Sequence, residues 1–165
     1  MVATSPLDHI LRHNTWATGA LIEFCRTLDA AKLDANAAGT YGSLYGTLQH
    51  LVGAEQWYTK LLTGETIGRP IRRTDAPHSL DELAPIATAT GARLLGVAAS
   101  DDPARVIVTN EPRRSTVGVV LAQVVHHGNE HRTQATTILG ANGIEPPALS
   151  AWAYGRAMRI STTEE

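Results

Sequence analysis

The segment from Ser115 to Leu139 carries the strongest pattern in this chain of 165 residues. Its apolar residues recur every three or four positions, which is typical of the core-facing stripe of an amphipathic helix. His127 and His131 lie on that same stripe, four residues apart. Four residues turn a helix by about 400° and raise it by about 6 Å, so both imidazoles point the same way. The pattern predicts a long helix with two histidines on its buried face.

Three earlier segments show the same helical periodicity. We expect helices over residues 5–29, 43–62 and 79–99. Each of these segments begins with a serine, a residue type whose hydroxyl can cap the free amides at a helix N-terminus. Four helices of roughly 20 residues, each with one apolar stripe, favour an all-α fold and specifically a four-helix bundle.

The segments between and after these helices have other patterns. Residues 67–78 are rich in Arg, Pro and Gly and lack periodicity, which predicts a loop. Residues 105–112 combine β-branched positions with turn chemistry, which predicts a short β-hairpin or an extended crossing before the last helix. In the tail, residues 144–165, Trp152 and Tyr154 are expected to pack back on the bundle.

The composition fits one ordinary domain spanning residues 1–165, with its core at about 5–140. A net charge of −2 supplies no basic field for nucleic acid and no cationic face for a membrane, so neither partner is expected. No apolar run approaches the ~18 residues that span a bilayer. The single cysteine, Cys25, excludes an internal disulfide, and the N-terminus lacks the pattern of a signal peptide. We therefore expect a cytoplasmic protein.

A third histidine, His50, falls on the apolar stripe of the second predicted helix. Polar side chains that face a core without partners cost on the order of 1–3 kcal/mol each. A divalent metal would satisfy His50, His127 and His131 together, because neutral imidazole binds Zn²⁺, Ni²⁺, Cu²⁺ and Fe²⁺ well. Three protein ligands would leave a coordination position for water or a substrate atom, as catalytic sites do.

Periodicity alone leaves alternatives to this metal site. A histidine on an apolar face is often a core residue whose ring is hydrogen-bonded to a carbonyl. His126 lies about 100° round the helix from His127 and would replace it if the predicted helical phase were wrong. The remaining histidines are expected in solvent, since His9 and His13 fall off the first stripe and His78 lies in the predicted loop.

Several other polar residues have roles that the pattern leaves open. Asn14 lies on the first apolar stripe and is a candidate buried polar residue. Gln134 follows His131 by one turn and is either a hydrogen-bond partner of a ligand or a polar flank. Glu55 comes five residues after His50, too far round the helix to be assigned to the same site. Cys25 is expected to be a packed, inert thiol.

Residues 126–134 read His-His-Gly-Asn-Glu-His-Arg-Thr-Gln. This run resembles the fourth-helix signature of the DinB/YfiT-like superfamily of metalloenzymes, in which a histidine and three residues precede His-Arg-Gly-Gln. Further matches lie at residues 14–17, at 48–51 with Glu55 and Trp57, and at 139–147. One departure is Thr133, where the family usually has glycine, and it puts close helix packing at that position in doubt.

The resemblance implies an up-down-down-up bundle, often a homodimer, with a divalent metal held by His50, His127 and His131. Zinc or nickel is the expected ion. Characterised relatives include thiol-dependent S-transferases and a maleylpyruvate isomerase, which implies an enzyme that uses a low-molecular-weight thiol as cosubstrate. Metal-assisted hydrolysis of a small molecule is the neighbouring possibility. The alternative is a non-catalytic metal-binding or stress-response protein, because the sequence identifies no general base and no substrate.

Overall fold

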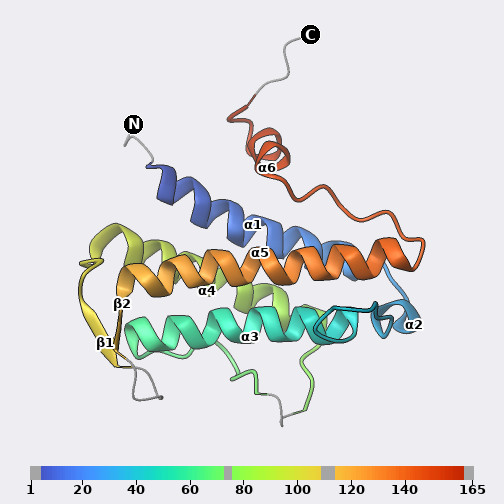
Figure 1. The fold of residues 1–165 in the computed structure, drawn as a ribbon, viewed down its shortest axis with the longest axis horizontal. Helices are drawn as coiled ribbons and strands as arrows, with labels where there is room; N and C mark the ends of the chain where they lie inside the picture. The colour runs from blue at the N-terminus through green and yellow to red at the C-terminus, as the bar shows by residue number, and fades with distance from the viewer. Residues whose placement is uncertain (1–4, 73–75, 109–113, 162–165) are drawn as a thin grey trace.

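The computed structural model describes residues 5–72, 76–108 and 114–161. Over these residues, four long helices lie side by side as a bundle (Figure 1). They are α1 (Pro6–Cys25), α3 (Leu44–Thr63), α4 (Leu80–Ser100) and α5 (Val117–Ala141). Two short helices, α2 (Ala30–Leu33) and α6 (Ala151–Ala157), flank the bundle. The predicted all-α bundle is confirmed.

The bundle has an up-down-down-up arrangement, with α3 and α4 running opposite to α1 and α5 (Figure 1). Helix α1 packs against α4 and α5, and α3 packs against the same two helices. Helices α1 and α3 are therefore diagonally opposite across the bundle. The parallel course of α3 and α4 requires the long connection that the sequence predicted over residues 67–78.

The serines expected at the helix starts act as caps. The hydroxyls of Ser5, Ser43 and Ser79 each accept a hydrogen bond from the backbone amide three residues later, at 3.1–3.2 Å. At Ser79 the cap is reciprocal, since its own amide donates to Glu82 at 2.8 Å. These bonds satisfy amides that have no partner within the first helical turn.

A two-stranded antiparallel sheet precedes the last helix, as the hairpin prediction expected. Strand β1 (Val106–Val108) pairs with β2 (Arg114–Thr116), with Ile107 opposite Ser115. The predicted turn at residues 110–112 lies outside the described residues. Because Ser115 belongs to β2, it does not begin the helix as the sequence suggested.

Helix α5 begins two residues later than predicted, at Val117. Its N-cap is Thr116, whose hydroxyl accepts from the amide of Val119. At its other end the helix continues beyond Leu139 to Ala141. These shifts at the ends leave the predicted phase of the helix unchanged.

The buried apolar residues form two clusters, one toward each end of the bundle. The first joins α1, α3, α4 and the C-terminal part of α5 through residues such as Leu21, Leu48, Leu83 and Ile138. The second joins the other ends of α3, α4 and α5 with β1, through residues such as Leu62, Leu94, Ile107 and Val120. Along α3, α4 and α5, buried polar residues lie between the two clusters: Glu55, Thr90, His127, His131 and Arg132. The interior therefore contains a polar layer at mid-bundle.

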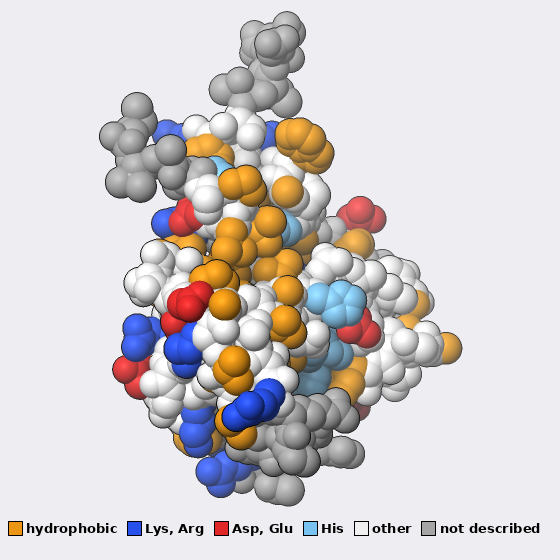
Figure 2. All heavy atoms as spheres, turned by 60° about the vertical axis from the view of Figure 1, so that its left-hand side comes forward, with side chains coloured by type: hydrophobic (Ala, Val, Ile, Leu, Met, Phe, Trp, Pro, Cys, Tyr) orange, Lys and Arg blue, Asp and Glu red, His pale blue; other side chains and the backbone are white. Residues whose placement is uncertain are grey.

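The first turns of α1 are an exception to the predicted core. Leu7 and Ile10 continue the apolar stripe, yet both are exposed. They line an open groove with α5 residues that include Val125 and His126. Figure 2 shows a band of hydrophobic side chains down one face of the molecule, with histidines beside it. Homodimerisation stays a prediction.

The tail contacts α1 through one of the two aromatic residues expected there. Tyr154 is buried, and its ring lies 5.7 Å from that of Trp16 and 5.9 Å from that of His13. His13 Nε2 also lies 2.7 Å from the carbonyl oxygen of Leu149. The prediction that His13 faces solvent is therefore wrong, because the tail covers it. Trp152 is 74 % exposed, so the prediction that it packs on the bundle is wrong.

Within the described residues, α4 is the one helix long and apolar enough to cross a membrane by length and composition. The sequence did not predict a membrane-spanning helix here, because the charged residues Asp81, Glu82 and Arg93 interrupt the apolar residues of α4. Its inner face joins both apolar clusters through residues such as Leu83 and Leu94. This placement is typical of the core helix of a bundle.

Candidate metal centre

Three histidine side chains from two neighbouring helices meet at mid-bundle. His50 projects from α3, and His127 and His131 project from α5. One ring nitrogen of each lies within 4.8 Å of the corresponding nitrogens of the other two. The Nε2 atoms of His50 and His127 are 3.1 Å apart. The structure thus brings together the three residues that the helical periodicity selected.

The phase of α5 decides between the two adjacent histidines. His127 and His131 are buried, whereas the His126 side chain is 76 % exposed and lies 3.9 Å from Glu130. His126 therefore does not replace His127. The alternative that the sequence left open is resolved in favour of His127.

A hydrogen bond fixes which nitrogen of His131 is free to bind a metal. The backbone amide of Tyr41 donates to Gln134 Oε1 at 3.2 Å. His131 Nδ1 lies 3.0 Å from the same oxygen. Because an amide oxygen can only accept, Nδ1 of His131 carries the proton and Nε2 keeps its lone pair. Gln134 is therefore the hydrogen-bond partner of a candidate ligand, one of the two roles considered from sequence.

The surroundings of His50 and His127 favour their neutral forms. Burial lowers the pKa of His127 to about 4, and the neighbouring histidines add to the effect. Burial, with a smaller contribution from His131, also lowers the pKa of His50. Neutral imidazole is the form that binds metals, so these two rings are in the required state near neutral pH.

The arrangement fits a divalent metal ion. Two nitrogens bound tetrahedrally to zinc at ~2.0–2.1 Å are roughly 3.3 Å apart, close to the Nε2 separation observed here. The chemistry of the donor set, three imidazoles and no thiolate, suits zinc or nickel.

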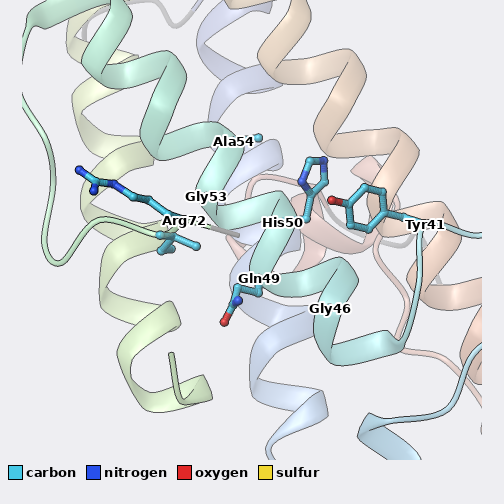
Figure 3. Close-up of a pocket in the computed structure, with 8 residues that line it drawn as sticks. Tyr41, Gly46, Gln49, His50, Gly53, Ala54 and Arg72 are labelled. Atoms are coloured by element: carbon cyan, nitrogen blue, oxygen red, sulfur yellow. The ribbon is translucent and has the colours of Figure 1, made fainter. Parts of the chain in front are cut away.

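One of the three histidines, His50, lines a cleft of about 400 Å³ on the outer face of α3. The ring of Tyr41 stacks on His50 with a centroid separation of 4.0 Å and lines the cleft. Gln49, Gly53 and Arg72 line it further along the helix (Figure 3). A small molecule could therefore approach His50 from solvent.

A buried polar network lies next to the histidines and was not predicted as a unit. Asn14 Nδ2 donates to Glu55 Oε1 at 2.8 Å, and Arg132 Nη1 donates to Asn14 Oδ1 at 2.8 Å and to Thr18 at 3.0 Å. Burial raises the pKa of Glu55 to about 7, against the opposing effects of Asn14 and Arg132. Burial also lowers the pKa of Arg132. The sequence signal was present, because Glu55 continues the α3 stripe at Leu48, Leu51 and Val52.

Gly128 permits the close approach of this network to α5. A Cβ atom at Gly128 would lie 2.3 Å from Asn14 Oδ1 and 2.9 Å from Arg132 Nη1. Such contacts are far shorter than van der Waals distances, so a larger residue requires one of the two side chains to move. Gly128 adjoins His127 in sequence, which ties the packing of α1 on α5 to the position of the candidate ligand.

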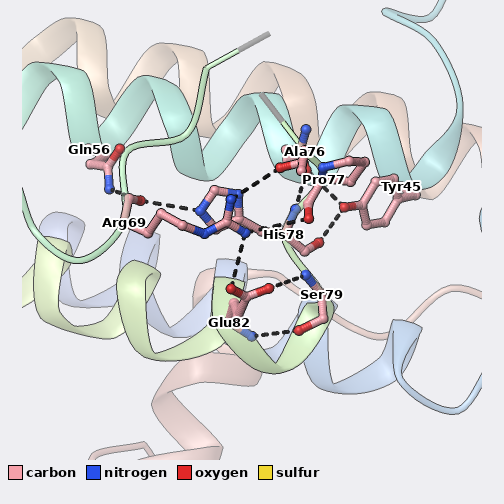
Figure 4. Close-up of polar contacts among 9 residues, drawn as sticks. Tyr45, Gln56, Arg69, Ala76, Pro77, His78, Ser79 and Glu82 are labelled. Atoms are coloured by element: carbon pink, nitrogen blue, oxygen red, sulfur yellow. Dashed lines mark hydrogen bonds and ion pairs between the residues drawn. The ribbon is translucent and has the colours of Figure 1, made fainter. Parts of the chain in front are cut away.

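The predicted solvent position of His78 is wrong. Its side chain is 1 % exposed, and its Nε2 lies 3.2 Å from the carbonyl oxygen of Arg69 (Figure 4). The backbone amide of His78 donates to Gln49 Oε1 at 2.9 Å, and its carbonyl accepts from the Tyr45 hydroxyl. Loop contacts remote in sequence bury this histidine, so its local sequence gave no sign of it.

Two other predictions are confirmed. His9 is exposed, as expected for a residue off the apolar stripe. Cys25 is fully buried, and burial raises the pKa of its thiol to about 12. The thiolate is the reactive form, so this cysteine is a packing residue.

A comparison with protein-family models identifies the fold family. The model of the DinB family matches residues 1–164. The chain belongs to the DinB family. Among solved structures, this DinB protein resembles a DinB-like protein from Bacillus cereus ATCC 10987, with a TM-score of 0.64 and 18 % identity. The likeness covers 83 % of this chain and 91 % of the other, and at that identity it concerns the fold. Among curated proteins, none matches the sequence.

The departure from the family signature at Thr133 is explained by its position. Thr133 is exposed on α5, and its hydroxyl donates to the carbonyl oxygen of Asn129 in the preceding turn. The substitution in this DinB protein therefore leaves the packing of the bundle unaffected.

Proposed function

We propose that this DinB protein is a divalent-metal-dependent enzyme whose metal ligands are His50, His127 and His131. The observation that supports the proposal is the convergence of three imidazole nitrogens within 4.8 Å of one another, with one of the three residues, His50, lining an open cleft. A structural metal site would be closed to solvent and would need a fourth protein ligand, whereas three ligands are typical of a catalytic site. Zinc and nickel, the ions we propose, are among those that suit an all-imidazole donor set.

Each residue around the centre has a defined part in this proposal. A bound divalent cation supplies Lewis acidity. Gln134 holds His131 with Nε2 toward the other two rings. Tyr41 stacks on His50, restricting the rotation of its ring and forming one wall of the substrate cleft.

Thiol-dependent S-transfer is the reaction class we favour, because a soft thiol sulfur binds well to zinc and nickel and becomes nucleophilic as a thiolate. Hydrolysis of a small-molecule substrate is the second reaction class. Assays that pair a panel of low-molecular-weight thiols with an electrophile, beside a panel of esters and amides, distinguish the two classes. Turnover that needs both metal and thiol would support transfer.

Elemental analysis of protein purified without a histidine tag tests the metal site. We expect about one equivalent of metal in the parent protein and little in His50→Ala or His127→Ala. The matched control is His126→Ala, which removes an adjacent but outward-facing imidazole and should retain the metal. Equal metal content in all four proteins, or none in the parent, would overturn the assignment.

A non-catalytic metal-binding or stress-response role is the alternative. It is favoured by one observation: among the described residues that line the cleft, there is no carboxylate to act as a general base. Full metal loading without turnover in either panel would support this alternative.

A further inference from the structure

The cleft beside the candidate metal centre has an unusual charge distribution. Among the described residues that line it, Arg72 alone carries a full charge, and no acidic side chain opposes it. Arg72 is exposed, and none of the arginine ion pairs among the described residues includes it. The cleft therefore joins His50, a candidate metal ligand, to a cation that has no ion-pair partner among the described residues.

The backbone that carries Arg72 is anchored to α3. Gln56 donates to the carbonyl oxygens of Ile67 at 2.6 Å and Arg69 at 3.0 Å, and it accepts from the amide of Ile71 at 2.9 Å. These bonds fix the segment immediately before Arg72 along the outer face of the helix. Arg72 therefore projects from a fixed position on the rim of the cleft.

Gly53 brings this segment close to the helix. A Cβ atom at Gly53 would lie 2.9 Å from Cγ2 of Ile71, so the glycine allows the segment to pack directly on α3. Gly53 follows His50 by three residues, which corresponds to about 4.5 Å along the helix axis. The base of Arg72 is thus roughly one helical turn from the candidate metal ligand.

The guanidinium of Arg72 is free to reach an anion in the cleft. Figure 3 shows it extended away from His50. Exposed side chains change rotamer in picoseconds to nanoseconds, so a bound anion can select a rotamer that lies over Gly53. Guanidinium groups bind carboxylates through two parallel hydrogen bonds, which suits them to recognise such a group.

We propose that the cleft binds a small anionic substrate or cosubstrate, with one atom directed to the histidine centre and a carboxylate paired with Arg72. This inference rests on the proposed metal site, since that site holds the other end of the ligand. Gly53 lies between His50 and Arg72 on the outer face of α3, where the lack of a side chain leaves room for the ligand (Figure 3). Uncharged molecules of the same length would lack the interaction with Arg72.

Protein loaded with Co²⁺ tests the proposal through binding alone. The probes are mercaptobutyrate and mercaptobutyramide, which have the same length and differ in charge, and thiolate-to-cobalt absorption reports their binding. We expect the parent to bind the carboxylate probe about three- to fivefold more tightly than the amide. The preference should weaken as ionic strength rises, because added salt screens an exposed ion pair.

Two variants isolate the contribution of Arg72. Arg72→Gln should bind cobalt normally and lose the preference for the carboxylate probe. Arg156→Gln removes an equal charge from α6, away from the cleft, and should retain the preference. A parent protein that binds cobalt without preferring the carboxylate, or an Arg72→Gln variant that keeps the preference, would overturn this inference and leave the metal site standing. A parent that binds no cobalt would overturn both.

Discussion

Asn14 on α1 donates a 2.8 Å hydrogen bond to Glu55 on α3, joining two helices that lie diagonally across the bundle. The same amide group accepts from Arg132 on α5. One neutral side chain therefore lies between a buried acid and a buried base and is hydrogen-bonded to both. Because buried charges are costly without partners, this amide is important for the stability of the polar layer.

Asn14→Ala should destabilise the protein by about 2–4 kcal/mol, since it removes a partner from both Glu55 and Arg132. Urea unfolding followed by circular dichroism measures the change. Asn129→Ala, at an exposed position on α5, is the control and should change stability by less than about 0.5 kcal/mol. Equal effects of the two substitutions would contradict the role of the network.

The shifted pKa of Glu55 predicts a dependence of stability on pH. Its pKa rises from an ordinary value of 4.5 to about 7 in the folded protein. Between these values the folded state binds more protons than the unfolded state, so the free energy of unfolding falls as pH rises. Between pH 4.5 and a pH above 7, the free energy of unfolding of the parent should fall by on the order of 3 kcal/mol relative to that of Glu55→Gln.

The comparison with Glu55→Gln is needed because the titration of His127 changes the free energy of unfolding with pH in the opposite direction. Its pKa falls from 6.5 to about 4, so its contribution to stability grows as pH rises through that window. Both proteins contain His127, and its effect cancels in their difference. Urea unfolding at a series of pH values gives that difference, and a constant difference would show that Glu55 does not titrate as proposed.

The helical phase in the sequence selected His50, His127 and His131, and the structure then excluded His126, whose side chain is exposed. Periodicity records which residues face the core, and the helix ends were misplaced by only a few residues. The relative directions of the helices came from the family resemblance, because an apolar stripe does not encode the direction in which its neighbours run. The cleft was not predictable, since it depends on how the loop at Ile71 packs on α3.

The wrong predictions share a physical cause, which is contact between segments remote in sequence. His13 and His78 were expected in solvent, but a tail and a loop cover them. For Leu7 the prediction failed in the opposite way. It lies on the apolar stripe and was expected in the core, but among the described residues no element covers the first turn of α1. Local pattern reports which face of a helix is apolar, and it does not report what covers that face.

Gly128→Ala should destabilise the protein by about 1–3 kcal/mol, because the new methyl group would lie 2.3 Å from Asn14 Oδ1. Gly140→Ala is a matched control on the same helix, with no atom within 4 Å of the new methyl group. It should stabilise the protein by up to about 1 kcal/mol, since alanine favours a helix over glycine. Thermal and urea unfolding of the two variants measure both effects. A neutral Gly128→Ala would show that Asn14 moves aside without cost.

Gln134→Ala should weaken metal binding by about tenfold or more without changing the set of ligands, because Gln134 Oε1 holds the Nδ1 proton of His131 and so directs Nε2 toward the centre. Loss of the second bond to that oxygen, from the amide of Tyr41, should also loosen the ring that stacks on His50. Competition with a chelating dye for zinc or nickel measures the affinity. Thr133→Ala removes an adjacent, exposed hydroxyl from the same helix and should bind metal like the parent. If Gln134→Ala and Thr133→Ala have the same affinity, then Gln134 does not orient the ligand, and packing alone holds the His131 ring in place.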